Sequence, residues 1–279
     1  MKCRNCTRGR FLIVVVLGSA LYFHGELRQI ISTSEVTIDG NELVERKGVY
    51  FKKLSEVPFT GKVTGEERGI IKNGKKQGSW VGYTGTGKLH SKENYIDGRK
   101  ESPTIRYYPN GEIQNIGNIK NAIREGTWVW YFNNGQLKEK GNYTNGKSEG
   151  PWVWYHKNGQ LQFKGNYKND KRDGTVENYH DNGQMSSKGK YTNGTLDGDW
   201  VHYWSNGQLS YEGNYKNGEE EGAWVFYQSN GHLRRKGNYK NGKKEGAWIF
   251  YNQDTTVNKK RTGSYKDGQK LVIKQRKKE

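Results

Sequence analysis

One position of a regular sequence pattern holds large aromatic side chains that could bind a partner: Trp130, Trp154, Phe226 and Phe250. Elsewhere the same position holds Gly, Arg, Asn and His. Because a packed core tolerates polar residues poorly, we expect this position to face outward. Exposed aromatic side chains are typical of the residues that contribute most to protein–protein binding. We therefore predict that these four residues form a partner-binding stripe; the alternative is that they only cover neighbouring strands.

No combination of residues in the sequence indicates catalysis or metal binding. The six histidines lie at scattered positions without the paired spacing of zinc ligands. The Gly-rich segments lack the P-loop pattern G-x-x-x-x-G-K-[ST]. Glu219, Glu220 and Glu221 are adjacent, and we interpret them as a solvated charge run rather than a calcium site, because no other copy of the pattern shares them. We expect no enzymatic activity, no cofactor and no metal.

A 24-residue period positions the aromatic residues. Tyr recurs at every 24th residue from Tyr83 to Tyr251, and a turn glycine follows at nearly every copy. Such a fixed period is the signature of a repeat protein. Phe59 with Gly74 resembles a degenerate first copy, and a slip of two residues after Tyr251 leaves Tyr265 in a last, irregular copy. The Trp column reads Trp80, Trp128, Trp152, Trp200, Trp224 and Trp248, with Thr104 and Val176 as exceptions.

Each copy is predicted to be a β-hairpin. In residues 126–149, the aromatic segment 127–132 favours a strand, and Asn133-Asn134-Gly135 favours a type I′ turn. Residues 136–143 alternate in polarity as a return strand does, and 144–150 form a polar turn to the next copy. The sequence thus predicts an all-β fold, in which tandem hairpins form an elongated, twisted antiparallel sheet with Trp128-type and Tyr131-type positions in its core.

The two ends of the chain differ from the repeats. Residues 1–10 are basic and 11–23 are a 13-residue apolar run, the layout of a signal peptide or an uncleaved anchor. The alternative is a buried first element of the domain. A signal peptide or anchor implies that the protein is exported or membrane-anchored, in the periplasm, the cell envelope or outside the cell. Much of the net charge of +18 lies in the ends rather than in the repeats, so we expect no nucleic-acid partner.

The predicted organisation has four parts. They are a signal peptide or anchor (1–25), a linker (26–47), the repeat array (48–268) and a basic tail (269–279). Cys3 and Cys6 precede the apolar run and are interpreted as incidental, because one C-x-x-C pair does not make a four-ligand zinc site.

Five units carry a family resemblance. They read NGKKQGSWVGY (73–83), NGKSEGPWVWY (145–155), NGTLDGDWVHY (193–203), NGEEEGAWVFY (217–227) and NGKKEGAWIFY (241–251), and they resemble the MORN repeat variant. The tandem arrangement over 48–268 is similar to the YwqK-like family, described as antitoxin components of toxin–antitoxin modules. The resemblance implies a non-enzymatic scaffold that neutralises a toxin by direct binding. An exported chain departs from this pattern if the toxin is cytoplasmic.

Three functions remain open at this point. The first is a scaffold for a protein partner, with the toxin as the partner that the resemblance implies. The second is a MORN-type protein that contacts membrane phospholipid through residues 11–23 and the basic tail. The third is binding of envelope glycan by exposed Trp and Tyr. The sequence leaves the oligomeric state open.

Overall fold

The computed structural model describes residues 36–272. Within this part, regular structure is almost entirely β-strand, and the helical segment is the 3-10 turn η1 (Gly40–Glu42). The predicted signal peptide or anchor (1–25) lies outside the described residues, as do residues 26–35 of the expected linker and 273–279 of the basic tail.

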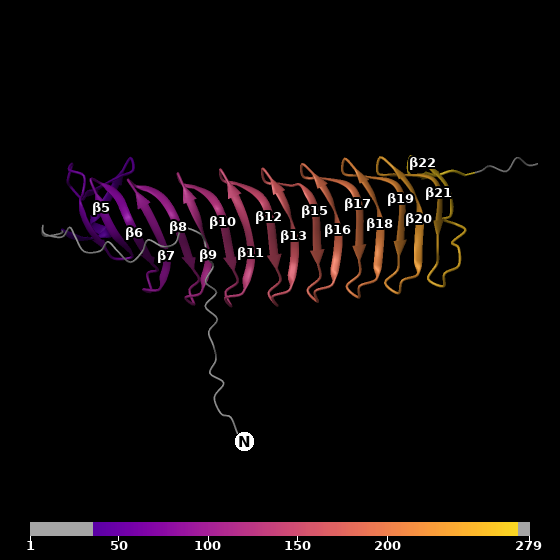
Figure 1. Ribbon diagram of the computed structural model, residues 1–279, viewed down its shortest axis with the longest axis horizontal. Helices are drawn as coiled ribbons and strands as arrows, with labels where there is room; N and C mark the ends of the chain where they lie inside the picture. Colours follow the sequence, from indigo (N-terminus) through magenta and orange to yellow (C-terminus); the bar gives the residue numbers. More distant parts are fainter. Residues whose placement is uncertain (1–35, 273–279) are drawn as a thin grey trace, which may run out of the picture. The chain divides into compact units, whose positions relative to one another are not determined.

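The repeats form one long sheet in which strands lie side by side in chain order (Figure 1). From β4 onward each strand pairs antiparallel with the next, except that the two-residue β14 and the following β15 both pair with β13. The prediction of an all-β fold built from tandem 24-residue hairpins is therefore confirmed. The strands are β4 (Gly61–Thr64), β5 (Glu67–Lys72), β6 (Lys75–Tyr83), β7 (Leu89–Ile96), β8 (Arg99–Tyr107), β9 (Ile113–Lys120), β10 (Ile123–Tyr131), β11 (Leu137–Thr144), β12 (Lys147–Tyr155), β13 (Leu161–Lys168), β14 (Lys171–Arg172), β15 (Gly174–Tyr179), β16 (Met185–Thr192), β17 (Thr195–Tyr203), β18 (Leu209–Lys216), β19 (Glu219–Tyr227), β20 (Leu233–Lys240), β21 (Lys243–Phe250), β22 (Gly263–Lys266) and β23 (Gln269–Lys270).

Residues before the first regular copy cover the N-terminal end of the sheet. Strand β1 (Thr37–Asp39) pairs in parallel with β4, and β2 (Leu43–Arg46) and β3 (Val49–Lys52) form a separate hairpin. Ile38 lies in a buried cluster with Trp80, and Leu43 packs against that cluster. The expected linker over 26–47 is therefore wrong from residue 37 onward, because apolar side chains outside the repeat pattern cover the first tryptophan. Terminal copies of a repeat array commonly take such a capping role.

The two turns of each copy differ from the predicted assignment. Asn145 and Gly146, with φ of 51° and 78°, form the two-residue turn between copies, as a type I′ turn requires. At the Asn133-Asn134-Gly135 turn, the N–H of Gly135 donates to the carbonyl oxygen of Phe132 at 2.9 Å, and of these three residues only Gly135 has positive φ. This is a type I turn followed by a glycine bulge, so the type I′ prediction for this turn is wrong. Residues 147–150 belong to β12 rather than to a polar turn.

The core consists of tryptophans that lie flat on glycines. Trp128, Trp152, Trp224 and Trp248 are at most 4% exposed. A Cβ added to the glycine eleven residues before each of them would overlap the indole. The predicted core role of the Trp128-type position is thus confirmed, whereas the Tyr131-type positions are only half-buried. The glycines are Gly117, Gly141, Gly213 and Gly237.

The two exceptions in the Trp column have local compensations. In the first of these copies, Glu93 replaces the glycine that lies under the indole elsewhere. The Trp column position eleven residues later holds the small, buried Thr104. In the copy with Val176, the glycine Gly165 is present, and the ring of Phe163 lies over it, 2.8 Å from where a Cβ would be. An aromatic ring therefore covers the glycine in each of these copies that keeps it.

Replacing Gly213 by Ala should lower the free energy of unfolding by about 1–3 kcal/mol, the usual cost of overpacking. The new Cβ would overlap the indole of Trp224, which Tyr215 and Tyr239 hold in place. Urea unfolding followed by Trp fluorescence measures this. Gly40→Ala is the control, because a Cβ there meets its nearest atom at an ordinary 3.5 Å. Equal urea midpoints for the two variants would contradict this account of the core.

Candidate partner-binding faces of the sheet

The predicted stripe residues lie on the same side of the sheet as the core tryptophans. Trp128 and Trp130 are two residues apart in β10 and pair with Gly141 and Glu139, so both point to one side. We call this side the aromatic face. Trp130 stacks between Trp128 and Trp152, with ring centroids 5.6 and 6.0 Å away. The stripe is therefore the outer part of the same aromatic layer, not a separate surface.

Three of the four predicted residues are half-buried and one is buried. Trp130, Trp154 and Phe226 each keep part of their surface exposed. Phe250 is only 2% exposed, so the expectation that it faces outward is wrong. The cause is the irregular last copy, which places Arg261 4.5 Å from the ring of Phe250. The structure thus keeps Trp130 next to Trp154 in adjacent copies, with Phe226 three copies further along.

Cations of the chain itself cover part of the aromatic face. Each lies four residues before a position of the Trp column and approaches an aromatic ring closely enough for a cation–π interaction. These cations were not among the predicted site residues, although their spacing in multiples of 24 residues is visible in the sequence. The contacts are Lys76 over Trp80 at 4.2 Å, Arg124 over Trp128 at 4.7 Å, Arg172 over Phe163 at 4.9 Å and Lys244 over Phe250 at 5.1 Å.

The opposite side of the sheet, which we call the valine face, carries an alternating row of aliphatic and charged residues. Neighbouring strands place Val129 opposite Lys140, Lys140 opposite Val153, and Val153 opposite Lys164. Lysines of this row are exposed, whereas the aliphatic residues are half-buried. The row continues through Glu177, Lys188, Val201, Glu212, Val225, Lys236 and Ile249.

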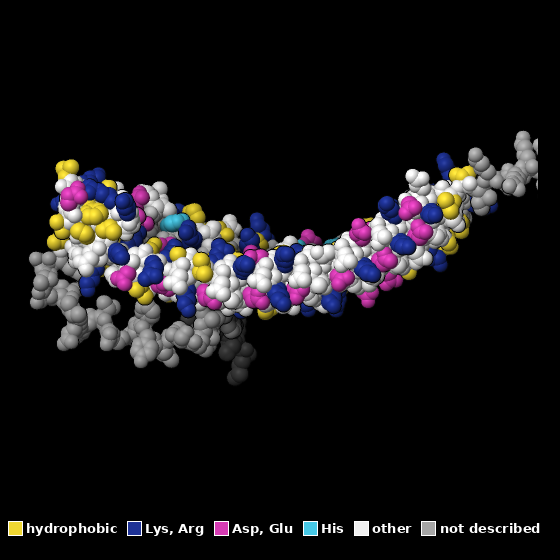
Figure 2. Space-filling view, turned by 90° about the horizontal axis from the view of Figure 1, so that it is seen from above, with side chains coloured by type: hydrophobic (Ala, Val, Ile, Leu, Met, Phe, Trp, Pro, Cys, Tyr) yellow, Lys and Arg dark blue, Asp and Glu magenta, His cyan; other side chains and the backbone are white. Residues whose placement is uncertain are grey.

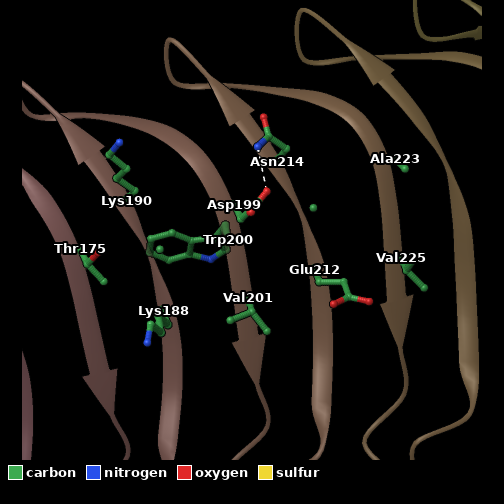
Figure 3. Close-up of a pocket in the computed structure, with 12 residues that line it drawn as sticks. Thr175, Lys188, Lys190, Asp199, Trp200, Val201, Glu212, Asn214, Ala223 and Val225 are labelled. Carbon is green, nitrogen blue, oxygen red and sulfur yellow. Dashed lines mark hydrogen bonds between the residues drawn. The ribbon is translucent and has the colours of Figure 1, made fainter.

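An open groove of about 780 Å³ lies across β15 to β19 (Figure 3). Val201 and Val225 give it apolar parts, and charged residues of both signs surround them. The side-chain amide of Asn214 donates to Asp199 at 3.0 Å, as the dashed line in Figure 3 shows. Its mixed lining fits a polar peptide surface better than a small apolar ligand. The charged lining residues are Lys188, Lys190, Asp199 and Glu212.

Glu177 is the most strongly perturbed carboxylate of the valine face. Lys164 lies 2.6 Å and Lys188 3.1 Å from its oxygens, and the hydroxyl of Tyr179 donates to it at 2.7 Å. The hydrogen bonds from Lys164 and Tyr179 lower the pKa of Glu177 to about 2. This carboxylate therefore joins three adjacent strands and stays charged at neutral pH.

The run Glu219–Glu221 is not uniformly solvated. Glu221 accepts a hydrogen bond from the backbone N–H of Asn241 at 3.0 Å, and Glu149 does the same for Asn169. These carboxylates support the left-handed Asn of the turn between copies. The interpretation as a solvated run holds only for the exposed Glu219, because Glu220 is half-buried on the aromatic face. Seen from above in Figure 2, basic side chains (Lys and Arg) and acidic side chains (Asp and Glu) are interspersed along the length of the molecule.

Two of the histidines join successive copies. The Nε2 atoms of His156 and His180 lie 3.0 Å from the carbonyl oxygens of Tyr179 and Tyr203, each 23 residues further along. Within residues 36–272, no group of three His, Cys, Asp or Glu is placed to hold a metal ion. In the same range, no helix has the length and apolar character needed to cross a membrane.

The fold and its two open faces define a β-repeat protein. A family model described as the MORN repeat variant matches six consecutive segments of the chain. They cover residues 100–121, 124–145, 148–169, 172–193, 196–217 and 220–241.

Further comparisons add little. The curated proteins gave no significant match. Among solved structures, the crystal structure of TcdB2-TccC3-Cdc42 aligns with 73% of this chain at 12% identity, with a TM-score of 0.19. The aligned part spans only 12% of that chain. Similarity at this level carries no argument about fold or function.

The pKa of Glu177 predicts a pH-dependent contribution to stability. Since its pKa is about 2 in the folded chain against an ordinary 4.5, the stabilisation is full above pH 4.5 and is lost as pH falls toward 2. Glu177→Gln should lower Tm by about 2–4 °C at pH 7. The difference from the parent chain should shrink between pH 4.5 and 2 in thermal melts. Glu212→Gln, in the same row, is the control and should leave Tm nearly unchanged at both pH values.

Proposed function

We propose that this chain is a non-enzymatic scaffold that binds a protein partner through its aromatic face. The observation that carries the proposal is the half-buried state of Trp130, Trp154 and Phe226 on a surface of stacked rings. Trp, Tyr and Arg dominate the energetics of protein interfaces, and this face is made largely of them. MORN repeat variants act in general as scaffolds, which agrees with this role.

The geometry of the face favours tight binding. Trp130 is stacked between two indoles, and the ring of Trp154 lies 4.3 Å from that of Phe163. Rings held in this way lose little conformational freedom when a partner covers them, which lowers the entropic cost of association. The sheet that carries them is hydrogen-bonded along its whole length, so the spacing between copies is fixed.

The antitoxin role is the finer part of the proposal. It rests on the resemblance to the YwqK-like family, in which the partner is a toxin neutralised by direct binding. The signal-like residues 1–25 add that the chain is exported or anchored, in which case its toxin acts outside the cytoplasm.

Affinity capture from a lysate of the source cells tests the proposal, with the full chain as bait at low and at high salt. We expect one dominant protein that survives high salt. The double variant Trp130→Ala/Trp154→Ala should weaken its binding at least about tenfold, because each ring removed costs on the order of 1–2 kcal/mol at an interface centre. Val153→Ala, on the valine face, is the matched control. Loss of binding by the control alone would contradict the choice of face.

The valine face favours a second candidate function, contact with an anionic phospholipid surface. Its row of exposed lysines lies on one side of a long sheet, with half-buried aliphatic residues between them. Basic residues near such a surface contribute about 1 kcal/mol each. The basic tail would add to this attraction.

Sedimentation with vesicles that contain phosphatidylserine tests this second function. Binding should weaken as salt rises, because exposed charges are screened. Lys140→Gln with Lys236→Gln should weaken binding roughly tenfold or more. Lys76→Gln serves as the control, since Lys76 is buried against Trp80 on the aromatic face. Equal binding to neutral vesicles would count against the lipid function.

A further inference from the structure

On the aromatic face, a row of tyrosines runs across the strands, and each tyrosine is paired with one residue of the next copy. Each tyrosine near the end of a return strand lies opposite a residue near the start of the following strand. In most copies that residue is a cation. The pairs are Tyr95 with Lys100, Tyr143 with Ser148, Tyr167 with Arg172, Tyr191 with Leu196, Tyr215 with Glu220, Tyr239 with Lys244 and Tyr265 with Lys270.

Cations at this position of the strand, including Arg124 opposite Ile119, fill a defined space between two rings. Arg124 lies 4.7 Å from the ring of Trp128, in its own strand, and 5.2 Å from the ring of Tyr143, in the next return strand. Lys244 lies 5.4 Å from Trp248 and 5.3 Å from Tyr265 in the same way. The chain thus shows repeatedly that the space between these two columns of rings accepts a cation.

Glu220 reverses the charge at this place. Its own copy supplies the same rings, because Trp224 packs edge to face with Tyr215 at 5.0 Å and with Tyr239 at 6.0 Å. Ser148 and Leu196 also lack a positive charge, but they add no negative one. Ring faces are negative, so a carboxylate beside them is unfavourable unless a cation lies between.

The surrounding cations are engaged elsewhere. Arg235 lies over the ring of Phe226 at 3.9 Å, and Lys244 lies between Trp248 and Tyr265. Within the part of the chain that the structure describes, neither forms an ion pair with Glu220 at 4 Å or less. Glu220, Tyr215 and Tyr239 are all half-buried, so part of each remains open to solvent. Burial and the charge of Glu220 together raise the pKa of Tyr215 to about 12.

We propose that Tyr215, Glu220 and Tyr239, backed by Trp224, form a binding site for an arginine side chain of the protein partner. The guanidinium would occupy the place that Arg124 takes in its own copy. It pairs with the Glu220 carboxylate and lies on the tyrosine rings, a combination that suits Arg better than Lys. The inference rests on the proposed function for the source of the arginine, and it deepens that function by naming the chemistry of the partner's contact.

Titration of the isotope-labelled full chain with N-acetyl-arginine amide, followed by amide NMR shifts, tests the site directly. We expect shifts at residues 215, 220 and 239, and none with the citrulline analogue, which keeps the shape but not the charge. Glu220→Gln should weaken binding at least about fivefold, because a charge-assisted pair is lost. Glu219→Gln removes the neighbouring exposed carboxylate and should change nothing.

Glu220→Lys provides a variant that separates binding from folding. It restores the residue type of Lys244 at the equivalent place, so it should raise Tm while abolishing the arginine-induced shifts. Equal shifts for Glu220→Gln and the parent chain, or shifts with citrulline, would overturn the site.

The captured partner distinguishes the site from the proposed function. If Glu220→Lys leaves the partner's affinity unchanged, the inference fails and the scaffold function stands. If arginine binds at this site but no partner is captured, the scaffold function fails and the cation site stands.

Discussion

The contact between each core tryptophan and the glycine eleven residues before it is the constraint on which the rest of the structure depends. An indole can lie flat on a neighbouring strand only where that strand has no Cβ, and Gly141 beneath Trp152 shows this directly. The contact joins the return strand of one copy to the first strand of the next. Because a two-stranded hairpin alone is marginal in water, this contact between copies is what makes each hairpin stable. The copies that lack a tryptophan show the same rule, since Phe163 takes the free space beside Val176.

While the tryptophans fix the stacking of the copies, polar contacts between copies hold the turns at both ends of the strands. At one end of the strands, a carboxylate such as Glu149 accepts a hydrogen bond from the backbone N–H of the Asn in the next turn. At the other, the amide of Asn182 donates to the carbonyl oxygen of Ser205 at 2.6 Å. These contacts repeat with the period of the sequence, so stability is distributed along the array rather than concentrated in one core.

The two faces of the sheet then differ for a simple physical reason. Tryptophans fill one side, so the side chains beside them are rings and cations that pack on rings, such as Trp130 and Arg124. The other side receives the alternate residues of the same strands, and short aliphatic side chains leave it open enough for lysines to remain hydrated. A single-layer sheet of this kind offers extended surfaces rather than enclosed cavities, which agrees with a binding scaffold.

The sequence by itself determined the period, the all-β hairpin fold and the core role of the tryptophan column, because each follows from local spacing that recurs in phase. It also predicted that Trp130, Trp154 and Phe226 face outward in a partner-binding stripe, and the structure shows these three side chains half-buried. Only the tertiary structure decided that Phe250 is buried, that the type I′ turn lies between copies at Asn145, and that Arg124 and Lys244 cover the rings. These features depend on which residues of neighbouring copies meet across the sheet, and strand alternation alone does not fix that register.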